Sequence, residues 1–386
     1  MDLGTNSAIS ASNELGIYIH VPFCERKCGY CDFYSIATPE PDTRLFRRFV
    51  HALKLEIALR REEWKKFASP VTVYLGGGTP SLLPESLLEQ IVRALDDAFG
   101  LARVREFSIE ANPGTVDYSR LAFYRSLGIN RLSIGAQAFQ DFLLQRLQRI
   151  HTARQIEEAV RDARRAGFTN LNLDLIFGIP GQSERDWLAS LRRALDLQPE
   201  HLSVYNLTYE EGTPFYSALR SGSLTPMQEE LEEKLYLAAH RSLTEAGFLH
   251  YEISNYARPG MACLHNLGYW NGRSYLGFGP SAHSYDGLSR WWNERNLAGY
   301  LEALEQGKLP PGGREELTAQ MRREEWLYLR LRQRSGLAKA EFEEITGSVW
   351  DEFLKKLRQN LGEKNWKAFF QFGSDRLALT PRGFWF

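Results

Sequence analysis

Short runs of β-branched and apolar residues alternate with longer amphipathic stretches between Gly16 and Leu207. This alternation is typical of strand–helix units that build a parallel sheet, and it predicts an α/β fold. One of the intervening helices has a capping box at its start, formed by Thr152 and Gln155. The strands are predicted at Ile17–Val21, Val71–Leu75, Glu106–Glu110, Arg131–Gly135, Leu171–Phe177 and Leu202–Leu207.

The two faces of these predicted strands differ in polarity. One face is apolar throughout, which suits packing under helices. The other face carries polar or polar-tipped side chains, namely Tyr18, His20, Thr72, Tyr74, Ser108, Glu110, Ser133, Gln137, Asn172, Asp174, Ser203 and Tyr205. A closed eight-stranded barrel fills its interior with branched apolar layers, and an unpartnered buried carboxylate is strongly unfavourable. We therefore expect an open barrel whose interior holds solvent or a ligand.

The rest of the chain reads as an extension of the barrel followed by a small domain. A charged helix is predicted over Met227–Ala246, and an aromatic-rich stretch follows from Tyr251 to Trp292. Gly307, Pro310, Pro311, Gly312 and Gly313 predict a linker, and the tail from Glu315 reads as helices ending in a short strand at Leu377–Thr380. We divide the chain into a flexible amino terminus (1–15), a barrel (16–225), a barrel extension (226–306) and a small, mainly helical C-terminal domain with a winged-helix module as one arrangement (314–386).

Composition excludes several classes of protein. The 386 residues contain 47 Lys and Arg against 48 Asp and Glu, so no basic field favours nucleic acid as a partner. No apolar run reaches the length of a membrane-spanning helix, and residues 1–16 lack the basic and apolar parts of a secretory signal. Four cysteines are too few for a disulfide framework. We expect a cytoplasmic protein in a reducing compartment.

Three of the four cysteines fall within eight residues, directly after the first predicted strand: Cys24, Cys28 and Cys31. Three thiolates at this spacing suit three irons of a 4Fe–4S cube and leave the fourth iron without a protein ligand. The alternative is a structural zinc site completed by His20 or Cys263. Structural zinc usually draws its ligands from paired short knuckles, and the sequence has no second pair.

The Cys-x-x-x-Cys-x-x-Cys loop resembles that of the radical S-adenosylmethionine (SAM) enzymes, and the resemblance extends over about residues 16 to 300. It implies an open (β/α)6 partial TIM barrel. It also implies that the open iron chelates SAM and that an electron from a donor protein cleaves the sulfonium to a 5'-deoxyadenosyl radical. Whether this chain cleaves SAM or only binds it stays open.

A second motif, Leu75–Ser81, follows the second predicted strand with three consecutive glycines. Glycine lets backbone approach a ligand closely, and the resemblance implies that this segment holds the SAM ammonium. Polar residues at the ends of later strands each read alone as capping or surface residues, but together they supply carboxylates and a guanidinium for SAM. The resemblance assigns SAM contacts to Tyr18, Tyr30, Gly77, Gly78, Thr79, Glu110, Gln137, Arg149 and Asp174.

Within the superfamily, Tyr18–Cys24 and Gly77–Pro80 resemble the oxygen-independent coproporphyrinogen III oxidase group. True oxidases of this group carry a further cysteine two residues after the third and a longer amino-terminal segment, whereas this chain has Phe33 at that position and a short start. Both departures resemble the HemW-type heme chaperones, which bind heme and pass it to heme proteins. The alternative is the oxidase itself, which decarboxylates coproporphyrinogen III to protoporphyrinogen IX, so enzyme activity is left open.

A third motif matches the His-Asn-x-x-Tyr-Trp signature of these chaperones and consists of His265, Asn266, Tyr269 and Trp270. Imidazole is a common axial ligand of heme iron, and aromatic side chains offer flat faces to a macrocycle. A His-Asn turn that caps a Tyr-Trp core pair explains the motif equally well without heme. Cys263 reads as a small buried hydrophobe, and His283 is a second candidate near the site.

The partners implied by the resemblance are heme and acceptor heme proteins, membrane-bound respiratory proteins among them. Peripheral contact with a membrane is therefore left open, and so is a homodimer. The mixed charges of the C-terminal domain give no reason to expect DNA binding.

Overall fold

The computed structural model describes residues 14–64 and 69–386. Most of the segment predicted to be flexible, residues 1–13, lies outside the described residues. Leu15 already belongs to the first strand, β1 (Leu15–Val21).

Six parallel strands form the centre of the molecule in the order in which they occur in the chain. They are β1, β4 (Pro70–Gly77), β5 (Glu106–Ala111), β6 (Arg131–Gln137), β7 (Leu171–Phe177) and β8 (His201–Asn206). Every neighbouring pair is parallel, as the crossover pattern predicted. The six predicted strands are confirmed, with bounds that differ by at most two residues.

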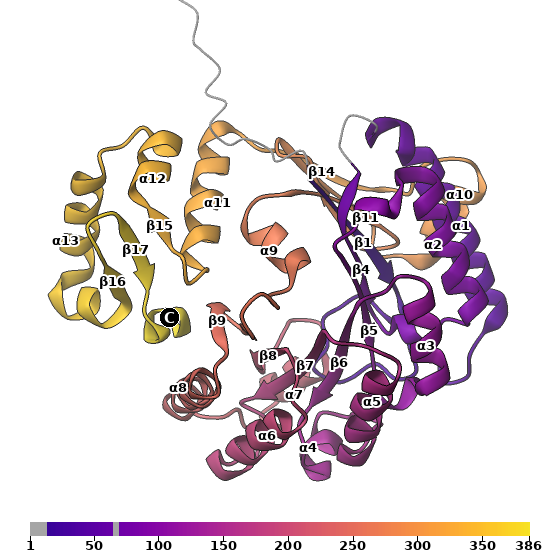
Figure 1. The fold of residues 1–386 in the computed structure, drawn as a ribbon, viewed down its shortest axis with the longest axis horizontal. Helices are drawn as coiled ribbons and strands as arrows, with labels where there is room; N and C mark the ends of the chain where they lie inside the picture. The colour runs from indigo at the N-terminus through magenta and orange to yellow at the C-terminus, as the bar shows by residue number, and fades with distance from the viewer. Residues whose placement is uncertain (1–13, 65–68) are drawn as a thin grey trace, which may run out of the picture.

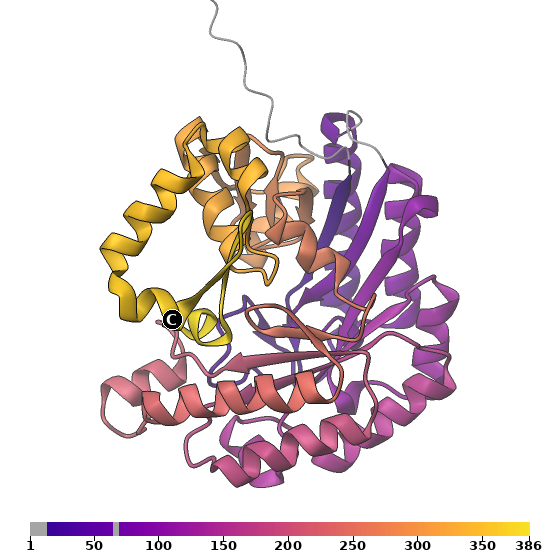
Figure 2. The same ribbon diagram turned by 60° about the vertical axis from the view of Figure 1, so that its left-hand side comes forward.

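Helices follow the strands and cover the convex side of the sheet (Figures 1 and 2). They are α1 (Thr43–Trp64), α2 (Glu85–Phe99), α3 (Tyr118–Ser126), α4 (Asp141–Arg146), α5 (Ala153–Arg165), α6 (Glu184–Asp196) and α8 (Glu229–Glu245). The short helix α7 (Pro214–Arg220) follows β8 and does not belong to this layer. Thr152 forms the predicted capping box of α5. The apolar strand face packs beneath these helices, where Ile17, Ile19 and Val21 are completely buried. The polar face is left on the concave side.

The sheet continues beyond the six strands at both edges. Next to β8 lie the short antiparallel strands β10 (Asn255–Ala257) and β9 (Leu249–Glu252). On the other edge, β11 (Ser274–Phe278) pairs in parallel with β1, and three antiparallel strands follow it, β12 (His283–Tyr285), β13 (Ser289–Asn293) and β14 (Gly312–Glu316). Helix α10 (Leu297–Glu305) connects β13 to β14. The outermost strands β14 and β9 do not pair with each other, so the barrel is open as predicted.

The predicted linker is only partly correct. Gly312 and Gly313 are not linker residues, because they form the start of β14 and pair with Asn293 and Trp292. A side chain at position 313 would collide with the ring of Trp292, since a Cβ there would lie 2.2 Å from Cζ2. Glycine at this position therefore reflects close packing within the sheet.

The C-terminal domain contains α11 (Ala319–Leu331), α12 (Lys339–Thr346), α13 (Trp350–Phe369) and a three-stranded sheet of β15 (Leu337–Ala338), β17 (Arg376–Leu379) and β16 (Phe370–Phe372). It has its own apolar core, built around Trp326, Trp350 and Trp366. The predicted terminal strand exists as β17, but the chain does not end there. Helix α14 (Pro381–Trp385) follows and packs against α8 of the barrel.

In the described part of the chain, no helix is at once long enough and apolar enough to span a bilayer.

Candidate functional site

The cysteine loop begins where β1 ends. Cys24 lies in β2 (Phe23–Cys24), which pairs with β3 (Ile36–Ala37), and a turn brings the Cys31 amide to the carbonyl of Cys28 at 3.2 Å. Cys28 is buried, and Cys24 and Cys31 are partly exposed. Burial is the main cause that raises the pKa of the Cys24 thiol, and it raises the pKa of Cys31 to about 11. Raised pKa values favour the protonated thiols of Cys24 and Cys31 at neutral pH, so binding metal to these two residues would release protons.

A chain of hydrogen bonds links Cys24 to Cys28 across three strand ends. The Thr79 hydroxyl donates to Sγ of Cys24 at 3.5 Å and accepts from Nδ2 of Asn112 at 2.9 Å. Arg149 donates to Oδ1 of Asn112, and its other terminal nitrogen lies 3.6 Å from Sγ of Cys28. The loop after β4 thus contacts Cys24, and the segment after α4 contacts Cys28. Asn112, in the loop after β5, connects these two segments. The charge of Arg149 acts against the larger effect of burial on the pKa of the Cys24 thiol.

The glycine segment lies against the start of the cysteine loop. The amide of Gly78 donates to the carbonyl of Val21 at 2.8 Å, and the amide of Thr79 donates to that of Phe23 at 2.7 Å. Gly77 has a φ of 106°, and a Cβ there would lie 2.6 Å from the ring of His20. At Gly78 a Cβ would lie 2.6 Å from the carbonyl oxygen of Phe23. The segment therefore has to be glycine for the loop to reach this position.

Glu110 ends the polar row of β5 and faces the glycine segment. Its carboxylate accepts from the hydroxyl of Tyr74 at 2.8 Å and from the amide of Gly77 at 3.2 Å. Burial, together with the negative charge of Asp174, raises the pKa of Glu110 to about 7 although both hydrogen bonds oppose the shift. A carboxylate held in this way gains most from a cationic partner such as an ammonium or sulfonium group.

Asp174 lies across the concave face from Glu110, on β7. Its carboxylate accepts from the hydroxyl of Ser133 at 3.1 Å and from Nδ2 of Asn172 at 2.8 Å, and burial raises its pKa. Gln137 ends β6 with a φ of 65°, an uncommon conformation for a residue with a side chain. Strain of this kind often marks a residue that is held in place for function.

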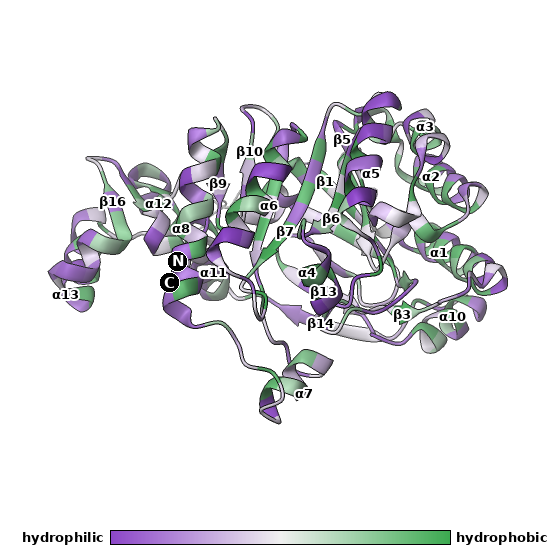
Figure 3. Cartoon of the chain, turned by 90° about the horizontal axis from the view of Figure 1, so that it is seen from below, coloured by the Kyte–Doolittle hydropathy of each residue, from purple (hydrophilic) through white to green (hydrophobic). Residues whose placement is uncertain are grey.

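The two predicted tyrosines occupy different places. Tyr18 on β1 stacks near Tyr74 inside the barrel, and its hydroxyl lies 3.1 Å from Nδ1 of His20. Tyr30 belongs to the cysteine loop and packs edge-on against Phe215 of α7, with the ring centroids 6.2 Å apart. The amide of Phe215 also donates to the carbonyl of Gly29 at 2.9 Å. Figure 3 shows α7 extending away from the body of the barrel.

The donor set fits an iron–sulfur cube better than the zinc alternative. Among the described residues, no group of three His, Cys, Asp or Glu side chains converges on a single-ion site. Both ring nitrogens of His20 are engaged, by the hydroxyl of Tyr18 and by the carbonyl of Tyr34 at 2.8 Å. Cys263 is buried next to Glu106, with Sγ 3.4 Å from its carboxylate. A cube gives each thiolate its own iron and so accepts wider spacing than one ion does.

The predicted heme motif forms α9 (Leu264–Trp270), which lies on the concave side of the sheet (Figure 1). The carboxylate of Glu106, at the start of β5, accepts from the amides of Leu264 and His265, both at 2.9 Å. Negative charge at a helix amino terminus is stabilising, so Glu106 fixes α9 in place. This position is at the amino-terminal end of the strands, opposite to the cysteine loop.

His265 is only 3% exposed, and both of its ring nitrogens have partners. Nδ1 lies 3.0 Å from the hydroxyl of Thr72, and Nε2 lies 2.8 Å from that of Tyr269. Burial lowers the pKa of His265 to about 3. In this conformation the ring offers no lone pair to heme iron, which favours the structural explanation of the motif. Trp270, at the end of α9, lies under the guanidinium of Arg332, while Asn266 beside His265 is partly exposed.

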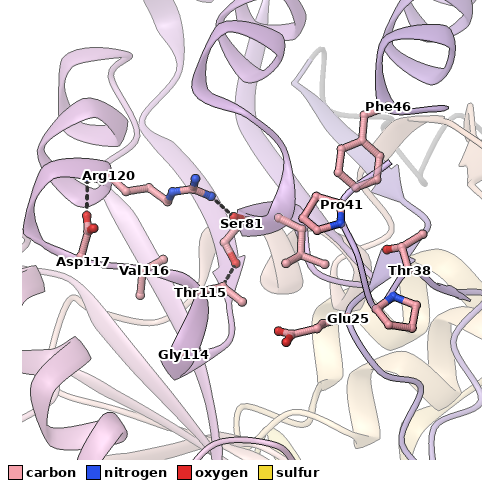
Figure 4. Close-up of a pocket in the computed structure, with 12 residues that line it drawn as sticks. Glu25, Thr38, Pro41, Phe46, Ser81, Gly114, Thr115, Val116, Asp117 and Arg120 are labelled. Carbon is pink, nitrogen blue, oxygen red and sulfur yellow. Dashed lines mark hydrogen bonds between the residues drawn. The ribbon is translucent and has the colours of Figure 1, made fainter. Parts of the chain in front are cut away.

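A pocket of about 430 Å³ lies on the outer side of the strand ends, next to the cysteine loop (Figure 4). Arg120 of α3 donates to the carbonyl of Ser81 on its wall, and the Ser81 hydroxyl lies 2.5 Å from that of Thr115. None of the predicted SAM or heme residues lines this pocket. Its wall is formed by Glu25, Thr38, Pro39, Pro41, Phe46, Ser81, Leu82, Gly114, Thr115, Val116, Asp117 and Arg120.

Two residues of the site were not predicted. Asn112 connects Thr79 to Arg149, and its position two residues after Glu110 in the same strand-end segment was an available signal. Phe215 contacts the cysteine loop although it lies 184 residues after Cys31 in the chain. No local sequence pattern predicts this contact.

Comparisons with known proteins agree with this architecture. The model of the Radical SAM superfamily matches residues 18–194, and that of the HemN C-terminal domain matches residues 317–386. Among solved structures, coproporphyrinogen III oxidase (HemN) from Escherichia coli, described as a radical SAM enzyme, has a TM-score of 0.82 and 24% identity. It covers 98% of this chain and 89% of its own, and it establishes the fold alone.

Curated relatives match over nearly the whole chain. Heme chaperone HemW of Mycobacterium tuberculosis strain H37Rv is 37% identical over 370 residues, which is 95% of this chain and 91% of the relative. That of Synechocystis strain PCC 6803 is 39% identical over 371 residues, 94% and 88% respectively. That of Bacillus subtilis strain 168 is 36% identical over 355 residues, 90% and 91%. On this identity and coverage, the chain belongs to the HemW heme chaperone family of the radical SAM superfamily.

Proposed function

We propose that this protein is a heme chaperone that binds heme and transfers it to acceptor heme proteins. The observation that carries the proposal is the similarity to curated heme chaperones over at least nine-tenths of this chain in the three relatives above. Phe33 supports it, because the oxidase group has a further cysteine at this position. Phe33 is 67% exposed beside the cysteine loop, where it offers apolar surface and no metal ligand.

We further propose that Cys24, Cys28 and Cys31 hold a 4Fe–4S cluster. When bound, such a cluster supplies an exchangeable electron and one iron that can chelate SAM. The residues of this chain would orient the nucleotide around it. Glu110 would face its cationic groups, and Arg149 would pair with its carboxylate. The other proposed contacts come from the cysteine loop, the glycine segment and the ends of the barrel strands. They are Tyr18, Tyr30, Gly77, Gly78, Thr79, Gln137 and Asp174.

The proposed partners are heme, acceptor heme proteins and an electron donor for the cluster. We place the protein in the cytoplasm, with peripheral contact at the membrane when the acceptor is a respiratory membrane protein. The sequence-based division began the C-terminal domain at residue 314. We propose residue 317 instead, because β14 belongs to the main sheet up to Glu316 and the HemN C-terminal match starts at residue 317.

The test is heme binding followed by transfer. Ferric heme is titrated into the anaerobically reconstituted full chain, and the Soret band is followed. Apomyoglobin is then added as the probe acceptor. We expect saturable binding and transfer of the bound heme to apomyoglobin at a rate that rises with the apomyoglobin concentration. Binding no tighter than to an unrelated protein of similar charge would refute the proposal.

The same preparation separates a chaperone from an oxidase. Incubation with coproporphyrinogen III, SAM and dithionite, followed by chromatography of the porphyrins, should yield no protoporphyrinogen IX. Its appearance at a rate above that of a Cys24→Ala, Cys28→Ala double variant would reverse the assignment, because that variant lacks two of the proposed cluster ligands.

A further inference from the structure

The polar face of the barrel continues across the antiparallel extension. Tyr18 on β1 is level with Gly277 on β11, His283 on β12 pairs with Trp292, and Trp292 pairs with Gly313 on β14. Tyr275 and Tyr285 form a pair on the same two inner strands, which places Gly277 opposite His283. Residues level with one another share a face of the sheet, so His283 and Trp292 lie on the concave side together with Tyr18.

His283 has the exposure that His265 lacks. Its side chain is exposed, and neither ring nitrogen has a hydrogen-bond partner among the described residues. Its ring stacks on the indole of Trp292, with centroids 5.6 Å apart and planes 27° apart. Partial burial and then the charges of Arg290 and Arg295 lower the pKa of His283, which keeps its ring neutral at pH 7. A neutral imidazole with a free lone pair is the form that binds iron.

The surroundings of His283 suit a flat ligand that carries negative groups. Two glycines, Gly277 and Gly313, stand in the same row, and the Trp292 indole lies over the backbone of Gly313. Because the two glycines have no side chains, the imidazole of His283 and the indole of Trp292 project above the neighbouring backbone of the row. The indole stacks on the imidazole and limits its rotation, so the ring nitrogens of His283 are held in one orientation.

Charged residues on both sides of the row complete this description. Arg295 has a side chain that is 56% exposed, and it donates to the carbonyl of Asp32 at 2.6 Å while the Asp32 carboxylate lies 3.6 Å away. Arg290 is bound by both oxygens of Glu325 from α11 and lies 3.6 Å from Glu315. Arg295 is therefore the cation with donors left for a carboxylate, whereas Arg290 is neutralised.

We call this row together with the neighbouring Arg295 the His283 shelf. It consists of His283, Trp292, Arg295 and Gly313. We propose that the His283 shelf is the heme-binding site, with His283 as axial ligand, the Trp292 indole holding the imidazole ring in place and Arg295 paired with a propionate. The proposal rests on the proposed function, and it moves the heme from α9 to the sheet extension. Binding forms one coordinate bond from an imidazole nitrogen to ferric iron and involves no change of oxidation state.

The shelf also adjoins the cysteine loop. Arg295 holds the carbonyl of Asp32, one residue after Cys31, and Phe33 follows directly with its exposed ring. Burial, and to a smaller extent the charge of Arg295, lowers the pKa of the His20 ring on β1. The heme proposed here would thus lie beside the proposed cluster, on the same face of one sheet.

The experiment titrates ferric heme into the full chain after anaerobic reconstitution of its cluster, with Soret difference spectra and electron paramagnetic resonance of the heme iron as readouts. His283→Ala removes the ligand, and Trp292→Leu removes the ring that stacks on the imidazole. His51→Ala is the matched control, because His51 is an exposed histidine on α1. His265→Gln tests the motif on α9. Circular dichroism and iron content establish that each variant is folded, and His283→Gln replaces any His283→Ala protein that is not.

We expect His283→Ala to weaken binding by about tenfold or more, a free-energy change of about 1.4 kcal/mol, and to remove the histidine-ligated signal. Added imidazole should restore that signal, while His51→Ala and His265→Gln leave it unchanged. Wild-type binding that survives both His283 variants unaltered would overturn the shelf and leave the chaperone proposal standing. A wild-type protein that binds no heme would instead refute the chaperone proposal itself.

Discussion

Single residues at the strand ends carry the strongest constraints on the site. Gly77 has a positive φ and lies so close to His20 that no side chain fits. Its amide at the same time donates to the carboxylate of Glu110. One backbone position therefore fixes the path of the loop after β4 and orients an acidic group toward the interior.

Replacing Gly77 by alanine tests this constraint. The new Cβ would lie 2.6 Å from the His20 ring in a left-handed conformation, so we expect Gly77→Ala to lower the free energy of unfolding by about 3 kcal/mol and to weaken SAM binding. Gly100→Ala is the matched control. Gly100 also has a positive φ, of 69°, but nothing lies within 4 Å of its Cβ position, so about 1 kcal/mol is expected. Urea unfolding of both variants checks the difference, and equal losses would contradict the proposed clash.

The carboxyl of Glu110 should make stability depend on pH. Its pKa is raised from 4.5 in the unfolded chain to about 7 in the folded one, mainly by burial. Between these values the folded state binds the additional proton, so the stability contributed by this group is present at pH 4.5 and falls as pH rises to 7, by about 3 kcal/mol. Glu110→Gln should remove this slope. Urea unfolding at pH 5, 6, 7 and 8 measures it, with Glu89→Gln at a partly exposed position of α2 as control, and parallel curves for wild type and Glu110→Gln would be inconsistent with the shift.

Sequence patterns predicted individual site residues only where those residues belong to a family motif. Thr79, Glu110 and Arg149 followed from the family resemblance, and the structure brings Thr79 and Arg149 together with two cysteines. The contact through Asn112 depends on how β4 and β5 are aligned, which a motif does not contain. For the same reason the motif at His265 gave no sign that Thr72 and Tyr269 occupy both nitrogens of the ring.

At the level of elements, the parallel strands were predictable and the extension was not. Strand β1 and strands β4 to β8 of the barrel are followed by helices, so each has a clear apolar row and clear ends. Strands β11 to β14 are three to five residues long and rich in Gly, Trp and Tyr, with one polar face and one face that packs under α1. These short strands are defined by their pairing in the sheet. The contact between Trp291 and Trp64 also depends on that pairing, so no local sequence pattern predicts it.

Helix α7 supports the cysteine loop from outside the barrel. Phe215 is buried in a small separate apolar cluster with Leu143, Leu147 and Ile179, and it covers Gly29, where a Cβ would lie 2.7 Å from its ring. Phe215→Ala leaves a cavity under the loop and should reduce stability by about 3 kcal/mol. We expect lower iron and sulfide content after anaerobic purification and faster bleaching in air. Phe142→Ala, at a ring that is 49% exposed on α4, is the control. Unchanged iron content and bleaching rate would show that the loop keeps its shape without α7.

Helix α14 joins the C-terminal domain to the barrel. Helix α14 returns from the C-terminal domain to the barrel, where Phe384 is buried against His250, Trp385 packs on Tyr236 and Arg382 pairs with Glu233 at 2.8 Å. The two parts of the chain are therefore joined by apolar contacts in addition to the covalent connection after β14.

Loss of this contact should separate the unfolding of the two parts. Phe384→Ala removes a buried ring, which should cost about 3 kcal/mol, and should make the C-terminal domain accessible to protease before the barrel. Differential scanning calorimetry and limited proteolysis with mass spectrometry of the fragments measure both effects. Phe386→Ala, at a ring that is 66% exposed, should leave the wild-type profile. A single transition in Phe384→Ala at the wild-type temperature would argue against a role for α14 in joining the two parts.

The continuous sheet from β1 to β12 also couples the two proposed sites mechanically. Only β11 separates β12 from β1, the strand that leads into the cysteine loop. A change in the course of β1 or β11 would therefore displace the His283 shelf and the cysteine loop together.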